Sequence, residues 1–492
     1  MQRIDVEGVP VFTAPGPERV SAALVFGVGI RDETYATLGI THLVEHLVMG
    51  ALPKSHLECN AMVDVATTSF MATGRPEAVA AFLEQVCRAL ADLPTHRIAL
   101  ETGVLEAENC PGAHPTAAVL WGARFRLAGP GLTVAGGGVP GVLTERQVLD
   151  HARRWFVRRN AALMWHGPRP EGLRLPLGEG WRMVRPVPRP RPQTGPVWTT
   201  GPTAGVGLLV RSEHLDDPAL DVALDVLEER VRDLARHQRG LSYSVESVSV
   251  DTGDARELAL LVDAREDQEA EVAHAVAGRM QSADGGPDAV AADLGRAALD
   301  ELADRPARTS DDVLAAWQAV TPRTAGAALR ATLPTAVLAV PAGVELPCLG
   351  GGIDRRPLCD VAPVLPHGER FSAPLLERLL GRSRRRLVVG AAALAEAADD
   401  GVVHVLPWAD VEAVEPSADG RGMLVVGRNL CEIDVHEHRY GRRAVAAVRS
   451  RLPRHLWLAP APVARPVVVE PSPAVVPAPA PAPVVEQANA PV

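Results

Sequence analysis

The order of strand-like and helix-like segments recurs on the two sides of a proline-rich linker. Before the linker, apolar strand-like runs lead to a helix that opens near Gly39, and a helix followed by the strand-like residues 161–167 closes the region. The linker, PVPRPRPQTGP, spans residues 186–196. After it, GVGLLVRSE again leads to a long helix, and a helix–strand pair over residues 320–341 closes the region. This recurrence predicts two related α+β units.

Beyond about residue 366 the character of the sequence changes. Short strand-like segments lead to one helix, RRAVAAVRSRL, which predicts a small antiparallel β unit closed by a helix. After Leu458 the chain is Pro/Ala/Val repetition, which cannot bury a core and predicts a disordered extension. The expected α+β chain therefore has five parts: a first lobe 1–175, a linker 176–196, a second lobe 197–346, a β unit 366–458 and a tail 459–492.

Composition excludes some classes of function. The 492 residues are 47% apolar, so a substantial core is available, and the net charge is −10. A negative chain of this kind is not expected to bind nucleic acid through a broad basic surface. None of the six cysteines forms a CxxC pair, so neither a cysteine zinc knuckle nor a disulfide framework is predicted.

The N-terminal segment and the lengths of the apolar runs indicate where in the cell the protein is expected. The N-terminus, MQRIDVEGVPVFTAPG, has no basic-then-apolar signal region. No uninterrupted apolar run reaches the length of about 18 residues that a membrane span needs. We therefore predict no membrane span and a cytoplasmic location.

The segment GITHLVEHLVMG carries two histidines and a glutamate within an apolar run. His42 and His46 are four residues apart, so on a helix they share one face, with Glu45 at its edge. Two neutral imidazoles in this spacing can hold one zinc ion, and a neighbouring carboxylate can take a proton from water activated by the metal. The pattern is the inverted zinc signature H-x-x-E-H.

Two histidines do not complete a zinc site, because catalytic zinc usually has three protein ligands. The segment ETGVLEAEN offers Glu101, Glu106 and Glu108 on one predicted helix. Glu101 and Glu108 are seven residues apart and share a face, whereas Glu106 points elsewhere. A third ligand is therefore expected from this helix.

The sequence GVGIRDETYATLGITHLVEHLVMGA resembles the M16 (pitrilysin-like, inverzincin) metallopeptidases. ETGVLEAE is similar to that family's second glutamate box. The resemblance implies that Glu108 is the third zinc ligand and that Glu101 supports the site. It also covers NAMVDVATTSF, where Asn60 and Ala61 begin an edge strand that in the family pairs with the backbone of a peptide substrate.

The second unit carries a match of its own. ARHQRGLSYSVES resembles the box in the family's C-terminal lobe in which an arginine and a tyrosine face the substrate. The corresponding residues are Arg236 and Tyr243, which could hydrogen-bond a substrate carbonyl or a developing oxyanion. One departure is the interval from His46 to Glu108, which is 62 residues and shorter than the resemblance implies, mostly before Asn60.

The resemblance implies a zinc endopeptidase with one zinc ion per subunit. His42, His46 and Glu108 would bind zinc, and Glu45, Glu101, Arg236 and Tyr243 would serve catalysis. Because two lobes of the family commonly form half of a closed chamber, a homodimer or a heterodimer with another M16-type subunit is implied. Such chambers take unfolded peptides or peptide precursors.

An alternative stays open, because some members of the family lose the motif and act as partners of an active subunit. On that hypothesis the chain is a non-catalytic binding or scaffold subunit, which the short interval and the added C-terminal unit allow. The C-terminal unit resembles a bacterial PH-like domain in LPWADVEAVEP, followed by a hairpin and a helix. This resemblance is to a fold and implies no ligand.

Overall fold

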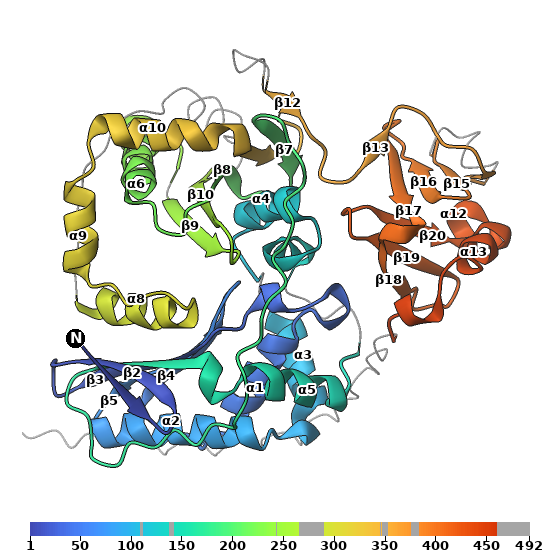
Figure 1. Cartoon of the computed structure of the whole chain (residues 1–492). Coiled ribbons are helices and arrows are strands. Elements are labelled where there is room, and N and C mark those ends of the chain that lie inside the picture. Colours follow the sequence, from blue (N-terminus) through green and yellow to red (C-terminus); the bar gives the residue numbers. More distant parts are fainter. Residues whose placement is uncertain are drawn as a thin grey trace, which may run out of the picture.

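The first lobe is built on a six-stranded mixed sheet in a computed structural model (Figure 1). The strand order is β1-β2-β6-β3-β5-β4, in which β2 and β6 are parallel and the other pairs antiparallel. The strands are β1 (Gln2–Val6), β2 (Val9–Ala14), β3 (Val20–Phe26), β4 (Glu58–Val63), β5 (Thr68–Gly74) and β6 (Ala161–His166). The structure describes residues 1–108, 112–136, 142–242, 244–264, 290–344, 346, 353–374 and 383–459, with residues 290–292 as backbone.

Four helices accompany this sheet. They are α1 (Ile40–Ala51), α2 (Pro76–Ala91), α3 (Ile98–Glu108) and α5 (Glu145–Trp155). Helix α2 packs on β3 and β5, and α1 contacts α2, α3 and α5. The apolar face of α1 is fully buried at Leu43 and Leu47, which belong to the same apolar core as Phe26 and Phe70 of the sheet. This burial fixes the rotation of α1 and therefore the direction in which its polar residues point.

The second lobe repeats the first. Its sheet order, β12-β7-β11-β8-β10-β9, matches the first from the second strand onward, including one parallel pair between β7 and β11. The strands are β7 (Val197–Gly201), β8 (Gly205–Ser212), β9 (Val245–Asp251), β10 (Arg256–Asp263), β11 (Val337–Pro341) and β12 (Asp354–Arg355). The helices are α6 (Pro218–Arg232), α8 (Val290–Leu302), α9 (Ser310–Gln318) and α10 (Pro322–Thr332). The predicted pair of related α+β units is confirmed, and β12 lies beyond the expected end of the second lobe at 346.

The lobes exchange helices. Helix α4 (Pro115–Phe125) follows α3 in the chain but packs on β8, β10 and β11 of the second sheet. Helix α8 packs in turn on β2 and β6 of the first sheet, with Leu294 and Ala298 fully buried there. Each sheet is therefore covered in part by a helix from the other lobe. The lobe boundaries, 1–175 and 197–346, remain predictions.

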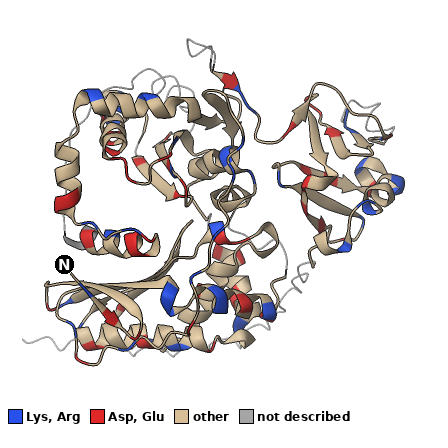
Figure 2. Cartoon of the chain, viewed as in Figure 1, with Lys and Arg blue, Asp and Glu red and all other residues tan. Residues whose placement is uncertain are grey.

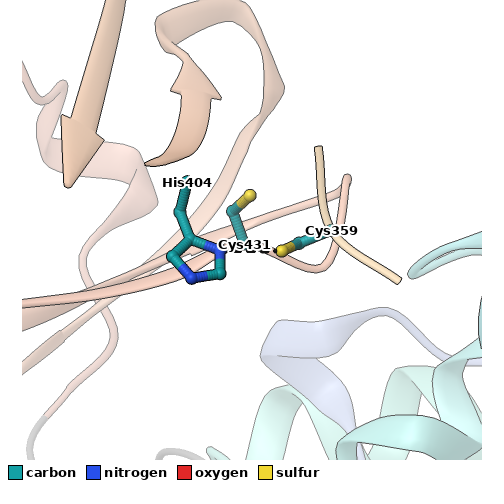
Figure 3. Close-up of side chains that lie close together, drawn as sticks. All are labelled: Cys359, His404 and Cys431. Carbon is teal, nitrogen blue, oxygen red and sulfur yellow. Dashed lines mark hydrogen bonds between the residues drawn. The ribbon is translucent and has the colours of Figure 1, made fainter. Parts of the chain in front are cut away.

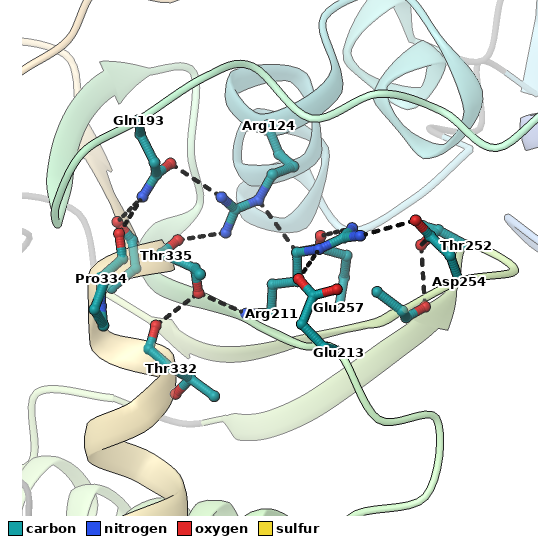
Figure 4. A network of polar contacts seen from close by, with 12 residues as sticks. Arg124, Gln193, Arg211, Glu213, Thr252, Asp254, Glu257, Thr332, Pro334 and Thr335 are labelled. Atoms are coloured by element: carbon teal, nitrogen blue, oxygen red, sulfur yellow. Dashed lines mark hydrogen bonds and ion pairs between the residues drawn. The ribbon is translucent and has the colours of Figure 1, made fainter.

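A buried ion network fastens α4 to the second sheet (Figure 4). The Arg124 Nε donates to Glu257 Oε2 at 3.2 Å, and Arg211 Nη1 donates to Glu257 Oε1 at 3.2 Å. Arg124 is 2% exposed and Glu257 is fully buried. The Arg124 Nη1 also donates to Gln193 of the linker at 3.0 Å. The network therefore joins α4, the linker and β8 and β10.

Glu257→Ala is expected to lower the free energy of unfolding by about 3–5 kcal/mol, because it leaves the buried Arg124 guanidinium without its carboxylate partner and removes the buried one of the carboxylates that contact Arg211. Glu213→Ala is the matched control, since Glu213 accepts from the same Arg211 at 3.0 Å but is 73% exposed. Its loss should cost about 1 kcal/mol or less. Denaturant titration of both variants measures the difference, and equal losses would contradict the assignment.

The C-terminal unit is an antiparallel β structure with a closing helix, as predicted. One sheet has the order β13-β17-β16-β15-β14 and the other β18-β19-β20. The elements are β13 (Val361–Ala362), β14 (Glu369–Ser372), β15 (Arg386–Val389), β16 (Ala393–Ala397), β17 (Val403–Pro407), β18 (Val411–Pro416), β19 (Gly422–Gly427), β20 (Glu432–His436), α12 (Glu437–Tyr440) and α13 (Arg442–Arg449). Both sheets and α13 share one core. A PH-like identity stays a prediction, and residues 460–492 of the expected tail lie outside the described residues.

This unit packs on the first lobe. Tyr35 and Leu127 of the first lobe join Ala413 and Val426 in one apolar cluster. The Tyr35 hydroxyl donates to Glu415 at 2.6 Å, and the backbone N–H of Leu127 donates to the carbonyl of Arg428 at 3.1 Å. The contact lies next to the segment that leads into α1.

Charged residues of both signs are spread over the two lobes and the C-terminal unit (Figure 2). Within the described ranges, no helix has the length and apolar character needed to cross a membrane.

Candidate metal centre

Helix α1 begins at Ile40, and the residues that precede it in the chain cap its N-terminus. Gly39 has φ +82°, a left-handed conformation that favours glycine. The Glu33 carboxylate accepts from the backbone N–H of Gly39 at 2.8 Å and of Thr41 at 2.9 Å. Burial raises the pKa of Glu33 to about 7. This cap fixes the helix end that precedes the two histidines.

The structure brings His42, His46 and Glu108 together. One ligand atom from each residue lies within 4.8 Å of the others. The Glu108 Oε2 is 3.4 Å from His46 Nε2 and 3.9 Å from His42 Nε2. His42 and His46 are on α1, whereas Glu108 is the last residue of α3. The spacing within α1 and the packing of α3 on α1 together produce this cluster.

Glu45 lies beside the same imidazoles. Its Oε2 is 3.6 Å from His42 Nε2 and 3.8 Å from His46 Nε2, and the residue is 7% exposed. Burial, followed by the charges of Glu108 and Glu101, raises the pKa of Glu45 to about 7. Burial and the neighbouring His46 lower the pKa of His42, which favours the neutral imidazole that a metal requires.

Glu101 supports the cluster from behind. Its Oε2 is 3.6 Å from His46 Nδ1, on the opposite side of the ring from Glu108. Arg97 donates to Glu101 Oε1 from Nε at 3.1 Å and from Nη2 at 2.6 Å. A carboxylate in this place orients an imidazole and raises its basicity as a ligand. Sequence reasoning missed Arg97, although its spacing of four residues from Glu101 is a signal for a pair on one helix face.

Gly50 permits the close approach of these groups. A Cβ atom at this position would lie 2.8 Å from Glu101 Oε1 and 3.0 Å from Arg97 Nη2. Helix α1 ends at Ala51 and β4 starts at Glu58, so residues 52–57 alone connect them. The short interval noted in the sequence therefore falls in this connection, and Glu108 still reaches the histidines.

The strand predicted to bind substrate is at the edge of the first sheet. Asn60 and Ala61 lie in β4, which pairs only with β5 among the described strands. Asn60 is exposed, and α1 packs next to β4. An edge strand of this kind presents unpaired backbone groups that an extended peptide could use.

The two residues expected from the second lobe are not placed at the cluster by the structure. Arg236 is exposed on the π-helical turn Asp233–Gln238 that continues α6. Tyr243 lies outside the described residues. Their participation stays a prediction.

A cavity of about 1820 Å³ lies between the lobes. It is lined by residues of both lobes and of the segment between them, among them Asp32, Arg185 and Arg256. Of the described residues lining it, none belongs to the His42, Glu45, His46 and Glu108 cluster. The cluster is therefore separate from this cavity, although Glu33, which caps α1, is among the residues that line it.

The donor set fits zinc. Two imidazole nitrogens and one carboxylate oxygen are the ligands of many catalytic zinc sites, which keep a further position open. His42 and Glu108 have side-chain exposures of 27% and 43%, so the cluster opens to solvent on one side. A carboxylate in position to take a proton, Glu45, lies within 4 Å of both histidine Nε2 atoms.

His151, which contacts α1 at Thr41, makes the stability of the folded chain sensitive to acid. Its Nε2 lies 3.0 Å from Thr41 Oγ1, and burial lowers its pKa from 6.5 to about 3. Between these pH values the unfolded chain binds a proton that the folded chain excludes. The contribution of His151 to the free energy of unfolding is therefore fully present above about pH 6.5 and decreases as pH falls. The loss of the His151 contribution between about pH 7 and pH 5 should be roughly 2 kcal/mol, measured as the difference in pH dependence between wild type and His151→Gln, because the raised pKa values of Glu33 and Glu45 act in the opposite direction. His151→Gln should remove this loss in denaturant titrations at both pH values, whereas His56→Gln, at an exposed position, should retain it. An unchanged pH dependence in His151→Gln would contradict the assignment.

Comparisons with known proteins identify the fold of the lobes. No family model matches the sequence, and no curated protein matches it. Solved structures do match. A peptidase M16 inactive domain from Pseudomonas fluorescens aligns at TM-score 0.52 and 13% identity, over 70% of this chain and 99% of that one. The first half of the periplasmic protease PqqL from Escherichia coli aligns at 0.50 and 13%, over 69% and 91%.

A protease from Helicobacter pylori aligns at TM-score 0.50 and 12% identity, over 69% of this chain and 98% of that one. At such identities the likeness concerns the fold alone, and the chain has the fold of M16 peptidases. Because one of these structures is an inactive domain, the fold does not decide whether a chain hydrolyses peptides. The residues at the site must decide it.

Proposed function

We propose that this chain is a zinc-dependent endopeptidase of the M16 type that hydrolyses unfolded peptides or peptide precursors. The observation that carries the proposal is the position of Glu108, whose Oε2 lies 3.4 Å and 3.9 Å from the Nε2 atoms of His46 and His42. These three residues would hold one zinc ion per subunit. Glu45 beside them would supply the acid–base chemistry.

Each group at the site would have a distinct role. Zinc would supply Lewis acidity, which polarises a peptide carbonyl and activates water near neutral pH. Glu45 would take the proton from the attacking water and pass it to the leaving amine, for which a pKa of about 7 is well matched. Glu101 would hold the His46 ring through Nδ1, and Arg97 would hold Glu101.

The substrate would bind as an added strand. An extended peptide pairing with the exposed edge of β4 at Asn60 and Ala61 would run beside α1. Arg236 and Tyr243 of a second lobe would hydrogen-bond the carbonyl under attack. Because the cluster is open to solvent in a single chain, we propose that a second M16-type subunit, identical or different, closes the chamber. The PH-like identity of the C-terminal unit and a cytoplasmic location remain part of the proposal.

The second candidate is a non-catalytic subunit that binds peptides or an active M16 partner. It is favoured by the match to an inactive M16 domain over 99% of that domain. The two candidates differ in what the metal does. A scaffold could bind zinc and show no turnover, whereas the peptidase loses its turnover when zinc is removed.

Metal removal tests the proposal. Treatment of the purified chain with a zinc chelator should abolish cleavage of an unfolded, fluorescently labelled peptide library, and added zinc should restore it. Calcium or magnesium should not restore it, because a nitrogen-containing donor set favours zinc over these ions. Full zinc content with no cleavage of the library, with or without M16-type partner subunits, would favour the scaffold.

A further inference from the structure

Three side chains from distant parts of the C-terminal unit, Cys431 buried and Cys359 and His404 partly buried, meet in one place (Figure 3). Cys359 lies in the segment that leads from the lobes into the unit, His404 is on β17, and Cys431 directly precedes β20. One ligand atom from each lies within 4.8 Å of the others, and Cys359 Sγ is 3.0 Å from His404 Nδ1. The site therefore draws on both sheets of the unit and on the connection to the lobes.

The donor set is that of a soft divalent ion. Two sulfurs and one imidazole nitrogen suit zinc, and this Cys₂His combination occurs among zinc sites. In a tetrahedral zinc site the bond lengths place a sulfur and a nitrogen ligand about 3.6 Å apart, so the Cys359 and His404 side chains would separate by about half an ångström. A small side-chain rotation provides this.

The surroundings hold the three residues in place. Asn429, which is fully buried, donates from Nδ2 to the carbonyl of Val405 at 2.9 Å and to Asp360 Oδ2 at 3.2 Å. Its Oδ1 accepts from the backbone N–H of Cys431 at 3.2 Å. One amide side chain thus joins the neighbours of Cys359 and His404 to the backbone of Cys431. Such bonding around ligands is what orients them in metal sites.

The position of the cluster gives it a structural purpose. Strand β13 is two residues long, and it pairs with β17 at His404 and Val403. This short strand begins two residues after Cys359. Asp360, between them, accepts from Arg126 of the first lobe at 2.9 Å and from Arg191 of the linker at 3.0 Å. An ion bound here would fix the point at which the lobes join the C-terminal unit.

We infer that Cys359, His404 and Cys431 form a second metal site, taken by zinc, that clamps the connecting segment to both sheets of the C-terminal unit. The described residues supply three ligands, and a water molecule would complete the tetrahedron. Binding releases the proton of each thiol to solvent, and no oxidation is involved. The inference does not depend on the proposed peptidase activity.

Cobalt substitution tests the site in the full chain. Cobalt-loaded protein should show thiolate-to-cobalt charge-transfer absorption, which the sulfur-free His42, His46 and Glu108 cluster cannot produce. The absorption should persist in the His42→Ala/His46→Ala double variant and in Cys59→Ser, whose cysteine is exposed and remote in sequence. It should be lost in Cys359→Ser/Cys431→Ser, and the zinc content of that variant should fall by one per chain.

Two results would overturn the inference. One is a cobalt spectrum of the wild-type protein without thiolate charge transfer. This measurement does not depend on whether any variant folds. The other is a disulfide between Cys359 and Cys431, found by mass spectrometry of peptides from metal-loaded protein prepared without alkylation artefacts. Failure of the peptidase proposal would look different, because unfolded peptides would not be cleaved while the thiolate charge-transfer band remained.

Discussion

Glu45→Gln is expected to lower kcat/KM for an unfolded peptide by about 10²–10⁴-fold, the usual contribution of a positioned general acid–base group. Glutamine has nearly the same shape as glutamate but cannot accept the proton of the attacking water. Glu45 Oε2 lies 3.6 Å from His42 Nε2 and 3.8 Å from His46 Nε2, so it is next to any water held between them. Because Glu45 is not one of the three proposed ligands, the zinc content should stay at the wild-type value.

The comparison needs a control and two readouts. Glu77→Gln on α2, at an exposed position, should keep both wild-type activity and wild-type zinc. Activity is measured as cleavage rate per zinc-loaded subunit, with zinc counted by elemental analysis of the same samples. A Glu45→Gln variant that cleaves as fast as wild type would remove Glu45 from the mechanism.

Much of the fold followed from the order of elements in the sequence. The recurring order of strand-like and helix-like segments on each side of the linker predicted two related units. The two sheets indeed share their strand order from the second strand onward. The exchange of α4 and α8 could not be predicted in this way. The apolar face of a helix shows that it packs on something, but Leu294 and Ala298 carry no sign of which sheet they cover.

The candidate site was predictable to different degrees. The spacing of His42 and His46 alone places two imidazoles on one face of a helix. The choice of Glu108 over Glu106 came from the periodicity of α3 and from a family resemblance. The contact between His46 and Glu108 could not be predicted from local spacing, because 62 residues separate them in the sequence. The Glu33 cap and the Arg97–Glu101 pair depend on tertiary packing.

The cysteine cluster escaped sequence reasoning for a physical reason. Rules for zinc knuckles look for two cysteines within one turn of chain. Cys359, His404 and Cys431 come instead from a connecting segment, a strand and the start of another strand, and only the folded sheets bring them within 4.8 Å. Arg236 and Tyr243 illustrate the opposite case, because a sequence box names them but the structure of one chain leaves their role untested.

The loss of Glu108 should be as severe for metal binding as the loss of Glu45 is for turnover. Glu108→Gln replaces an anionic ligand with a neutral amide, and changes even to groups that only orient ligands cost about 10–100-fold in metal affinity. We therefore expect zinc affinity at this cluster to fall by at least about 100-fold. Glu106→Gln is the matched control, because Glu106 is exposed on the same helix, α3, two residues away.

The most direct measurement is the zinc content of wild type, Glu108→Gln and Glu106→Gln after dialysis against the same zinc-buffering chelator. The account predicts that Glu108→Gln loses one zinc per chain relative to wild type and that Glu106→Gln loses none. Equal zinc content in all three proteins would contradict the account, because Glu108 would then have no part in holding the metal.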